Sequence, residues 1–239
     1  MWLRLYLTTE ALGALFDVDK STVSRNGRRV LAVLHQISQE ELVWPDPPRR
    51  GQGKDLAQAL EAHPDLFAIL DATEQPVQRP QEPERQRRFY SGKKKRHTIK
   101  TGLIVNEVGV IRGVTAPTPG SVHDIRHFRE SGLLRHIPRE TCVVGDSAFT
   151  GLQQDLPWHN LAIAHKARRN HPLTLGQKVM NQELAQLRIL VEHVFAAMKH
   201  FRILAERFRH TLELHHQAFL CIAALVNRRT RQRLAVQKA

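Results

Sequence analysis

The sequence has little cysteine, few aromatic residues and no long apolar run. Its 239 residues include 2 cysteines, Cys142 and Cys221, and only 6% are aromatic. Two cysteines are too few for a secreted disulfide framework or a four-ligand zinc site, so we expect reduced, buried thiols and a reducing cytosol. No stretch reaches the roughly 18 to 20 apolar residues that a membrane span needs, and 1–16 lacks the small-residue cleavage site of a secretory signal. We therefore expect neither secretion nor membrane insertion.

Positive charge is what the sequence has in excess. There are 36 Lys and Arg residues against 23 Asp and Glu, which gives a formal net charge of +13. Such a charge attracts polyanions, chiefly nucleic acid. The basic residues are concentrated at 85–100, where Phe89 and Tyr90 lie among them, and again at 228–238. Nucleic-acid binding is thus indicated, although solvated surface charge explains one such run about equally well.

Residues 7–36 read as two helices joined by a tight turn. Thr8 and Thr9 offer an N-cap for the first helix, the pattern breaks at 17–20, and Ser21 is expected to cap the second. The second helix would present Ser21, Thr22 and Arg25 at the end that enters a DNA major groove in a helix-turn-helix domain. A plain helical hairpin fits the same pattern.

The rest of the chain predicts an α/β domain. Pro and Gly gather at 44–54 and indicate a linker, so we divide the chain into a helix-turn-helix domain at 1–45, a linker at 46–64 and a second domain at 65–239. Apolar runs predict strands at 66–70, 97–107, 108–116, 141–144 and 161–165, and a charged loop at 78–88. Helices are expected at 181–208 and 212–226. The predicted class is a mixed sheet flanked by helices.

Two of the short apolar strands, LFAIL and CVVG, are each followed by an aspartate. These are Asp71 and Asp146. Carboxylates at the ends of central strands emerge at one edge of a sheet, where their oxygens can share a hard cation such as Mg²⁺. A single aspartate in this position is more often a cap or turn residue, and for the pair the two interpretations are balanced.

A charged stripe runs along the predicted helix at 181–208. Arg188, Glu192 and Lys199 fall on nearly the same side of a helix with ~100° per residue. A separate apolar stripe places Glu192 at the border of the buried face, which suits a metal ligand. A solvated row of ion pairs fits the spacing equally well. His123 and His127 are spaced i,i+4, but without a Cys/His cluster they read better as an incidental pair than as zinc ligands.

The three carboxylates Asp71, Asp146 and Glu192 together resemble those of the DDE transposases. The similarity extends from the helix-turn-helix to about residue 210 and is closest to the insertion-sequence family numbered five, whose eukaryotic relatives are the Harbinger transposases. It rests on the segments DATEQPV, YSGKKKRHTIKTGLIV, PGSVHD, GDSAF and RILVEHVFAAMKHFRIL. The last segment resembles the family's Tyr, Arg, Glu, Lys helix signature, with Ala185 at the position where many members have Tyr. Relatives usually carry more sequence before the helix-turn-helix, so we expect an N-terminal truncation.

The resemblance implies a fold, a chemistry and a set of site residues. The second domain would be RNase H-like, with Asp71, Asp146 and Glu192 as catalytic ligands of two divalent ions, Mg²⁺ or Mn²⁺. Phosphate or DNA-backbone contacts would come from Arg188, Lys199, Lys93, Lys94, Lys95 and His97. His123 and Asp124 match a further family motif and would be auxiliary residues.

The function implied is that of an insertion-sequence transposase. Such an enzyme binds the terminal inverted repeats of its element in double-stranded DNA, cuts the DNA and joins the freed ends to a target. Because two ends are handled together, we expect a homodimer or larger assembly, and a cytoplasmic, nucleoid-associated bacterial protein. Two alternatives remain open. One is a transposase-derived DNA-binding protein without activity, and the other is a hydrolytic nuclease that cuts without strand transfer.

Overall fold

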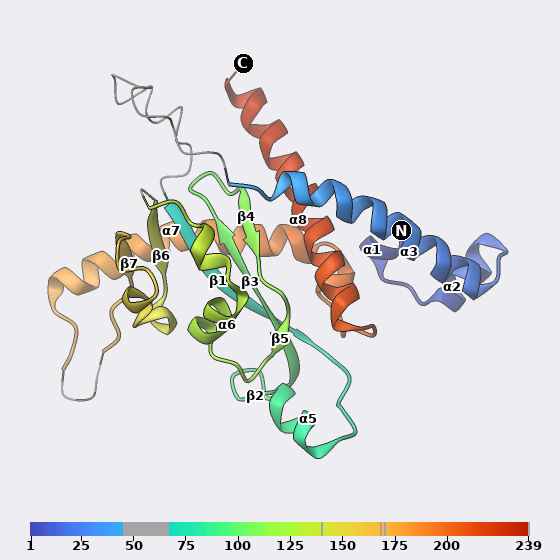
Figure 1. Cartoon of the computed structure of the whole chain (residues 1–239), viewed down its shortest axis with the longest axis horizontal. Coiled ribbons are helices and arrows are strands. Elements are labelled where there is room, and N and C mark those ends of the chain that lie inside the picture. Colours follow the sequence, from blue (N-terminus) through green and yellow to red (C-terminus); the bar gives the residue numbers. More distant parts are fainter. Residues whose placement is uncertain (45–66, 140, 168, 170, 239) are drawn as a thin grey trace.

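The centre of the molecule is a mixed β-sheet in the strand order β2-β3-β1-β6-β7 (Figure 1). The computed structural model describes residues 1–44, 67–139, 141–167, 169 and 171–238. β1 pairs antiparallel with β3 and parallel with β6, β6 pairs parallel with β7, and β4 and β5 add to β3. The strands are β1 (Phe67–Pro76), β2 (Tyr90–Ser91), β3 (Arg96–Val105), β4 (Ile111–Val114), β5 (Thr118–Pro119), β6 (Cys142–Gly145) and β7 (Leu161–Ile163).

Helices cover both faces of this sheet, which confirms the predicted α/β class. They are α1 (Trp2–Leu5), α2 (Thr9–Phe16), α3 (Lys20–Glu41), α5 (Pro83–Phe89), α6 (Asp124–Ser131), α7 (Leu175–Lys199) and α8 (Leu212–Lys238). The described residues also form the 3₁₀ helices η1 (Leu133–His136), η2 (Ser147–Phe149), η3 (Leu152–Gln154) and η4 (Arg202–Leu204). A mixed sheet between helices fits the fold of a DDE nuclease, while the finer RNase H-like assignment stays a prediction.

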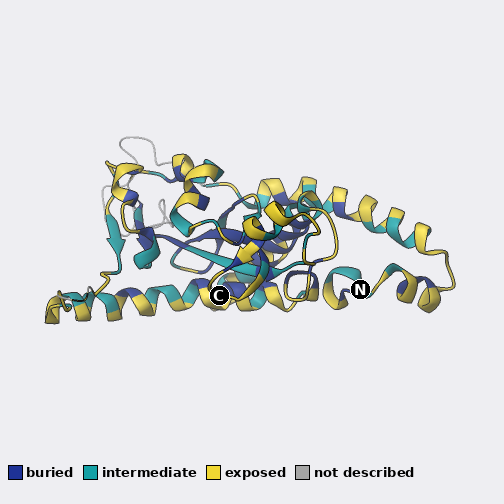
Figure 2. Ribbon diagram, turned by 90° about the horizontal axis from the view of Figure 1, so that it is seen from below, coloured by how far each residue is buried: buried dark blue, intermediate teal, exposed yellow. Residues whose placement is uncertain are grey.

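Strand alternation divides the core into two layers, one on each face of the sheet. Ile69 in β1 and Val144 in β6 pack with α7 and α8 on one face. Ala68 and Leu70 pack with Phe128 of α6 on the other face. Successive side chains of a strand point to opposite faces, so a single strand supplies both layers. Figure 2 shows the buried residues gathered in the sheet and on the helix sides that face it.

α6 approaches the sheet closely because β3 has a glycine beneath it. A Cβ at Gly102 would lie 2.5 Å from Cζ of Phe128, which is closer than carbon atoms can approach. The absent side chain therefore makes room for the aromatic ring. Phe128 has no exposed surface and also meets Phe149 edge to face, with ring centroids 5.4 Å apart.

Several predicted boundaries were wrong. The strand expected at 66–70 continues to Pro76, because β1 pairs with β3 over its second half. Asp71 therefore lies within the strand and not after its end. The expected loop at 78–88 contains most of α5, which begins with Pro83 at the first helical position, where proline is tolerated. The predicted linker at 46–64, and Leu66 at the start of the predicted strand, lie outside the described residues.

The two long helices also differ from their predicted limits. α7 begins at Leu175, six residues early, because Thr174 and Gln177 form a capping box at its N-terminus. It ends at Lys199, before the short turn η4, and not at residue 208. α8 runs twelve residues beyond the predicted 226, to Lys238. The hairpin of 97–107 and 108–116 is confirmed in β3 and β4, with Gly109 in the turn at a φ of 81°.

The N-terminal helices α2 and α3 form the predicted pair with a tight turn between them. Thr8 caps α2, as expected, by accepting a hydrogen bond from the backbone N–H of Ala11. The second cap was predicted wrongly. Asp19, and not Ser21, caps α3 by accepting from the backbone N–H of Ser21 at 2.7 Å. α3 therefore begins at Lys20, two residues before the start that a serine cap at position 21 would give.

These helices share the core of the sheet. Tyr6 and Leu31 belong to the same buried cluster as Ile69 of β1. The backbone N–H of Arg209 donates to the Tyr6 hydroxyl at 2.9 Å, and the Arg209 guanidinium donates to the Tyr6 carbonyl. The start of the chain is thus packed against the segment that precedes α8.

Both cysteines are free, as predicted. Cys221 is buried in α8, and burial raises the pKa of its thiol to about 11. Cys142 is half-buried at the start of β6, and burial raises its pKa as well. Across the part of the chain that the structure describes, no helix combines the length and apolarity that a membrane crossing requires.

Candidate active site

Asp71 and Asp146 lie beside each other on one face of the sheet. β1 and β6 run parallel with Ile69 opposite Val144, and the same register carried two residues further sets Asp71 beside Asp146. Both aspartates are half-buried. Because positions two apart on a strand share a face, both carboxylates lie on the side covered by α7. The expectation that the two aspartates emerge together is therefore met.

Each of these carboxylates has one oxygen held by the backbone. Oδ1 of Asp71 accepts from the N–H of Ala72 at 2.8 Å, and Oδ1 of Asp146 accepts from the N–H of Ala148 at 2.9 Å. The other oxygen of each faces a single guanidinium. Nη2 of Arg188 lies 3.8 Å from Oδ2 of Asp71 and 3.9 Å from Oδ2 of Asp146. Two fixed carboxylates thus direct their free oxygens at one cation.

Burial makes the negative charge of Asp71 costly. The pKa of Asp71 is raised, chiefly because burial disfavours the charged form, and the nearby charges of Asp146 and Asp124 add to the effect. The Ala72 N–H and the Arg188 guanidinium act in the opposite direction. The site therefore concentrates negative charge that a cation would stabilise.

α7 supplies two cationic side chains to this face of the sheet. Besides Arg188, Lys199 reaches the strand, and its Nζ donates to Oγ1 of Thr73 at 2.6 Å. The pKa of Lys199 is lowered, mainly by burial and then by the charge of Lys94, while Asp71 opposes this. Arg188 Nε is buried without a hydrogen-bond partner in the described structure. The predicted grouping of Arg188 and Lys199 on one side of the helix is thus observed.

The prediction that Glu192 lies at the border of the buried face was wrong. Its residue is exposed, while Val191 and Val194 beside it are buried. At ~100° per residue, Glu192 is about 120° from the centre of the apolar stripe and so passes beyond its edge. Among the described residues, no group of three or more His, Cys, Asp or Glu side chains is arranged to hold a metal ion.

The remaining predicted contacts lie around this site and in the N-terminal helices. Lys93, Lys94 and Lys95 are exposed in the turn between β2 and β3, where Lys95 has a φ of 52°. His97 follows in β3, with its ring 5.6 Å from that of Tyr90. In α3, Ser21 and Arg25 are exposed and Thr22 is half-buried.

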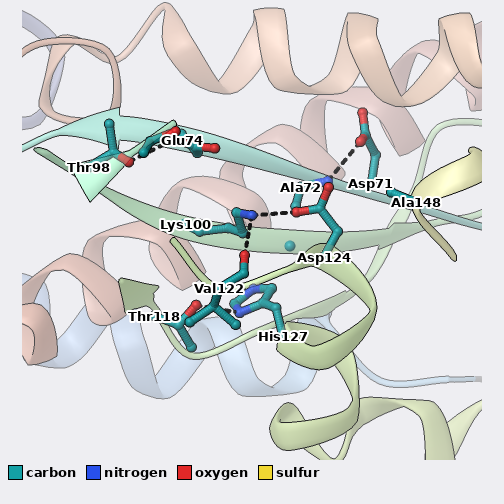
Figure 3. Close-up of polar contacts among 12 residues, drawn as sticks. Asp71, Ala72, Glu74, Thr98, Lys100, Thr118, Val122, Asp124, His127 and Ala148 are labelled. Carbon is teal, nitrogen blue, oxygen red and sulfur yellow. Dashed lines mark hydrogen bonds and ion pairs between the residues drawn. The ribbon is translucent and has the colours of Figure 1, made fainter. Parts of the chain in front are cut away.

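On the opposite face of the sheet, Lys100 and Asp124 form a close ion pair (Figure 3). Nζ of Lys100 lies 2.6 Å from Oδ1 of Asp124 and donates to the Val122 carbonyl at 2.5 Å. The exposed fraction of the Lys100 side chain is only 8%. The sequence interpretation missed this partnership, although a lysine inside a strand of buried residues is a recognisable signal. Asp124, predicted as auxiliary, is thus held by Lys100.

His127 is a buried residue of the core and no surface partner of His123. Its Nε2 lies 2.6 Å from Oγ1 of Thr115, and its Nδ1 lies 2.8 Å from Oγ1 of Thr118. Burial, assisted by the charge of Lys100, lowers the pKa of His127 to about 4, so the ring is neutral at pH 7. His123 is exposed at the N-cap of α6. With both ring nitrogens of His127 engaged, the pair is not set up to bind zinc.

Comparison with known proteins defines the class to which this site belongs. Residues 70–227 match the family described as DDE superfamily endonuclease. That range contains both aspartates and all of α7, and it covers more than half of the chain. The chain belongs to the DDE superfamily of endonucleases, and the resemblance to DDE insertion-sequence transposases is confirmed.

Two individual relatives agree with this class. The chain is 29% identical over 206 residues to the probable transposase for insertion sequence element IS702 of Microchaete diplosiphon, covering 86% of this chain and 69% of that protein. It is 34% identical over 85 residues to the transposase for insertion sequence element IS1106 of Neisseria meningitidis serogroup B, covering 34% of this chain and 29% of that protein. No solved structure matches.

Proposed function

We propose that the protein is the DNA transposase of an insertion sequence, which cuts phosphodiester bonds with the help of divalent cations. The observation that carries this proposal is the pair Asp71 and Asp146, whose free oxygens converge on the single cation Arg188. A structural ion pair would be closed by short hydrogen bonds, whereas here the contacts are 3.8 and 3.9 Å long. Membership of the endonuclease superfamily and the names of the two relatives support the same conclusion.

The pair of aspartates fits a hard divalent cation such as Mg²⁺ or Mn²⁺. Carboxylate oxygens are the donors that these ions prefer, and the backbone N–H groups of Ala72 and Ala148 already fix the two carboxylates. Asp71 and Asp146 would hold the metal, with Glu192 as the third ligand from α7. Two divalent ions bound there would activate a water or a 3′-hydroxyl of the DNA and stabilise the leaving oxygen.

The cationic side chains of α7 act on the charge around these carboxylates. Arg188 balances the charge of Asp71 and Asp146 in the free protein, and it would contact a phosphate when DNA is bound. Lys199 is held toward β1 by Thr73 and would contact a second phosphate. In both roles the side chain would pair with the negative charge of the DNA backbone. Such contacts position the strand without reading its sequence.

DNA would be held by surfaces on either side of the site. Lys93, Lys94, Lys95 and His97 would contact the backbone, with His123 and Asp124 as auxiliary residues. Ser21, Thr22 and Arg25 of α3 would read bases in the terminal inverted repeats of the element. Two element ends call for a homodimer or larger assembly.

The test is a nicking assay on supercoiled DNA that carries the ends of the element, with Mg²⁺, Mn²⁺ or EDTA. We expect metal-dependent nicking by the wild-type protein and its loss in Asp146→Ala and Glu192→Ala. The matched control is Glu183→Ala, which removes an exposed carboxylate from the same helix. Nicking that survives in Asp146→Ala or Glu192→Ala would refute the assignment of that ligand.

The products separate the alternative functions. Joining of the freed 3′ ends to target DNA supports a transposase, whereas nicking without joining would indicate a hydrolytic nuclease. Tight DNA binding with no nicking in either metal would indicate a transposase-derived binding protein. Because a ligand that binds the folded state stabilises it, Mn²⁺ should also raise the Tm of the wild-type protein and leave that of Asp71→Asn unchanged.

A further inference from the structure

A groove of about 650 Å³ lies on the side of α7 that faces α8 and α1. α7 contributes His193 and its C-cap contributes His200, α8 contributes Arg229 and Arg233, and α1 contributes Arg4. All five of these residues are exposed. The floor between them is apolar, and includes Phe201, over whose ring the Arg4 guanidinium lies at 5.4 Å. Three elements that are far apart in the sequence therefore present basic side chains to one groove.

The charge lining this groove is of one sign. It contains three arginines and two histidines, and no aspartate or glutamate lines it. Within the described residues, Arg229 and Arg233 form no ion pair, whereas Arg231 on the same helix is bound to Glu41. Arg229 and Arg233 are thus available for a ligand, whereas the charge of Arg231, outside the groove, is already neutralised by Glu41.

The groove is separate from the candidate active site. Arg188 and Lys199 contact the sheet from one side of α7, while His193 and His200 lie about 120° further around the helix. The body of the helix, about 10 Å across with its side chains, stands between the two surfaces. A single DNA strand lying against Asp71 and Asp146 would therefore not fill the groove.

We propose that this groove binds the phosphodiester backbone of duplex DNA, on a segment other than the one being cut. Arg229 and Arg233 are four residues apart, or about 6 Å along α8, which matches about two nucleotides of one strand at 3.4 Å each. Arginine forms bidentate contacts with phosphate oxygens, and it does so without regard to base sequence. The proposal rests on the proposed function only for the choice of DNA as the ligand.

The experiment measures binding of a 30-base-pair duplex of unrelated sequence to the full chain in EDTA, over a range of salt concentrations. The double variant Arg229→Ala/Arg233→Ala should lower the slope of log affinity against log salt by about 2, or about 0.9 per lost phosphate contact. Affinity at 0.1 M salt should fall about tenfold per arginine. The charge-matched control is Arg135→Ala/Arg139→Ala, which removes two exposed arginines, also four residues apart, that form no ion pair within the described residues.

A second pair of variants tests the position of the groove without removing any arginine. Ala196→Glu places a carboxylate in the groove, while Gln186→Glu adds the same charge on α7 about 15 Å away. We expect Ala196→Glu alone to weaken binding and reduce the salt slope. Equal effects of the groove and control variants, in either pair, would overturn the proposal, because long-range charge would then account for them. Since EDTA prevents metal-dependent cleavage, absence of nicking in the other assay would refute the proposed function without changing this result.

Discussion

Oppositely charged residues are closely paired on one face of the central sheet and stay further apart on the other. On the face covered by α6, Lys100 and Asp124 are 2.6 Å apart, and Lys100 also donates to the Val122 carbonyl. On the face covered by α7, the guanidinium of Arg188 stays at 3.8 and 3.9 Å from the two carboxylates. Polar groups that stabilise a fold are expected to be saturated, since an unsatisfied buried group is costly. The face covered by α7, where the contacts between charges are long, is therefore the face on which we place the functional site.

The largest loss of stability should come from breaking the ion pair between Lys100 and Asp124. Lys100→Met leaves Asp124 without its cation in a partly buried place, and the free energy of unfolding should fall by about 3 to 5 kcal/mol. Urea denaturation of both proteins measures the difference. The double variant Lys100→Met/Asp124→Leu removes both charges and should recover part of the loss. A fall below about 1 kcal/mol in the single variant would mean that the pair is not a stabilising one.

The next largest effect on stability concerns His127, on the face covered by α6. Its pKa is lowered from 6.5 to about 4, so the unfolded chain takes up a proton at a higher pH than the folded protein does. The stability contribution is complete above pH 6.5 and declines as the pH falls to about 4, by about 3 kcal/mol in total. Unfolding curves between pH 7 and 4 should show a flatter decline in His127→Gln than in wild type. His136→Gln, at an exposed position, should leave the decline unchanged.

The smallest change in stability is expected on the face covered by α7, and there the free energy of unfolding should increase. Because the pKa of Asp71 is raised, its ionised form costs stability once the pH rises through that pKa. Asp71→Asn should therefore increase the free energy of unfolding at pH 7 by about 1 kcal/mol, the usual scale of a stabilising substitution. Metal-dependent nicking should be lost at the same time. Destabilisation by Asp71→Asn would erase the contrast between the two faces.

The sequence predicted the core of the fold where apolar patterning was strong. The strands that became β3, β4, β6 and β7, and the apolar stripe of α7, follow from periodicity alone. The continuation of β1 beyond Asp71 does not, because the residues DATEQP have weak strand character. That half of the strand is stabilised by pairing with β3, from Asp71 opposite Leu103 to Pro76 opposite Thr98. Such pairing joins segments that are distant in the sequence.

The candidate site was predictable to the same extent. Two aspartates after apolar strands predicted the pair, and helical spacing predicted that Arg188 and Lys199 share a side of α7. The exposure of Glu192 was predictable as well, because helical spacing alone places it about 120° from the centre of the apolar stripe. The partnership of Lys100 with Asp124 crosses from β3 to α6, and no local pattern connects them.

The shared core of the N-terminal helices has a consequence for how the protein melts. Tyr6 and Leu31 pack in the same cluster as the sheet, and Cys221 and Ile222 of α8 belong to that cluster as well. Separating the first 44 residues would leave a side of α8 without its apolar neighbours. We therefore expect the helical start and the sheet to unfold in a single cooperative transition, with one calorimetric peak whose calorimetric and van't Hoff enthalpies agree.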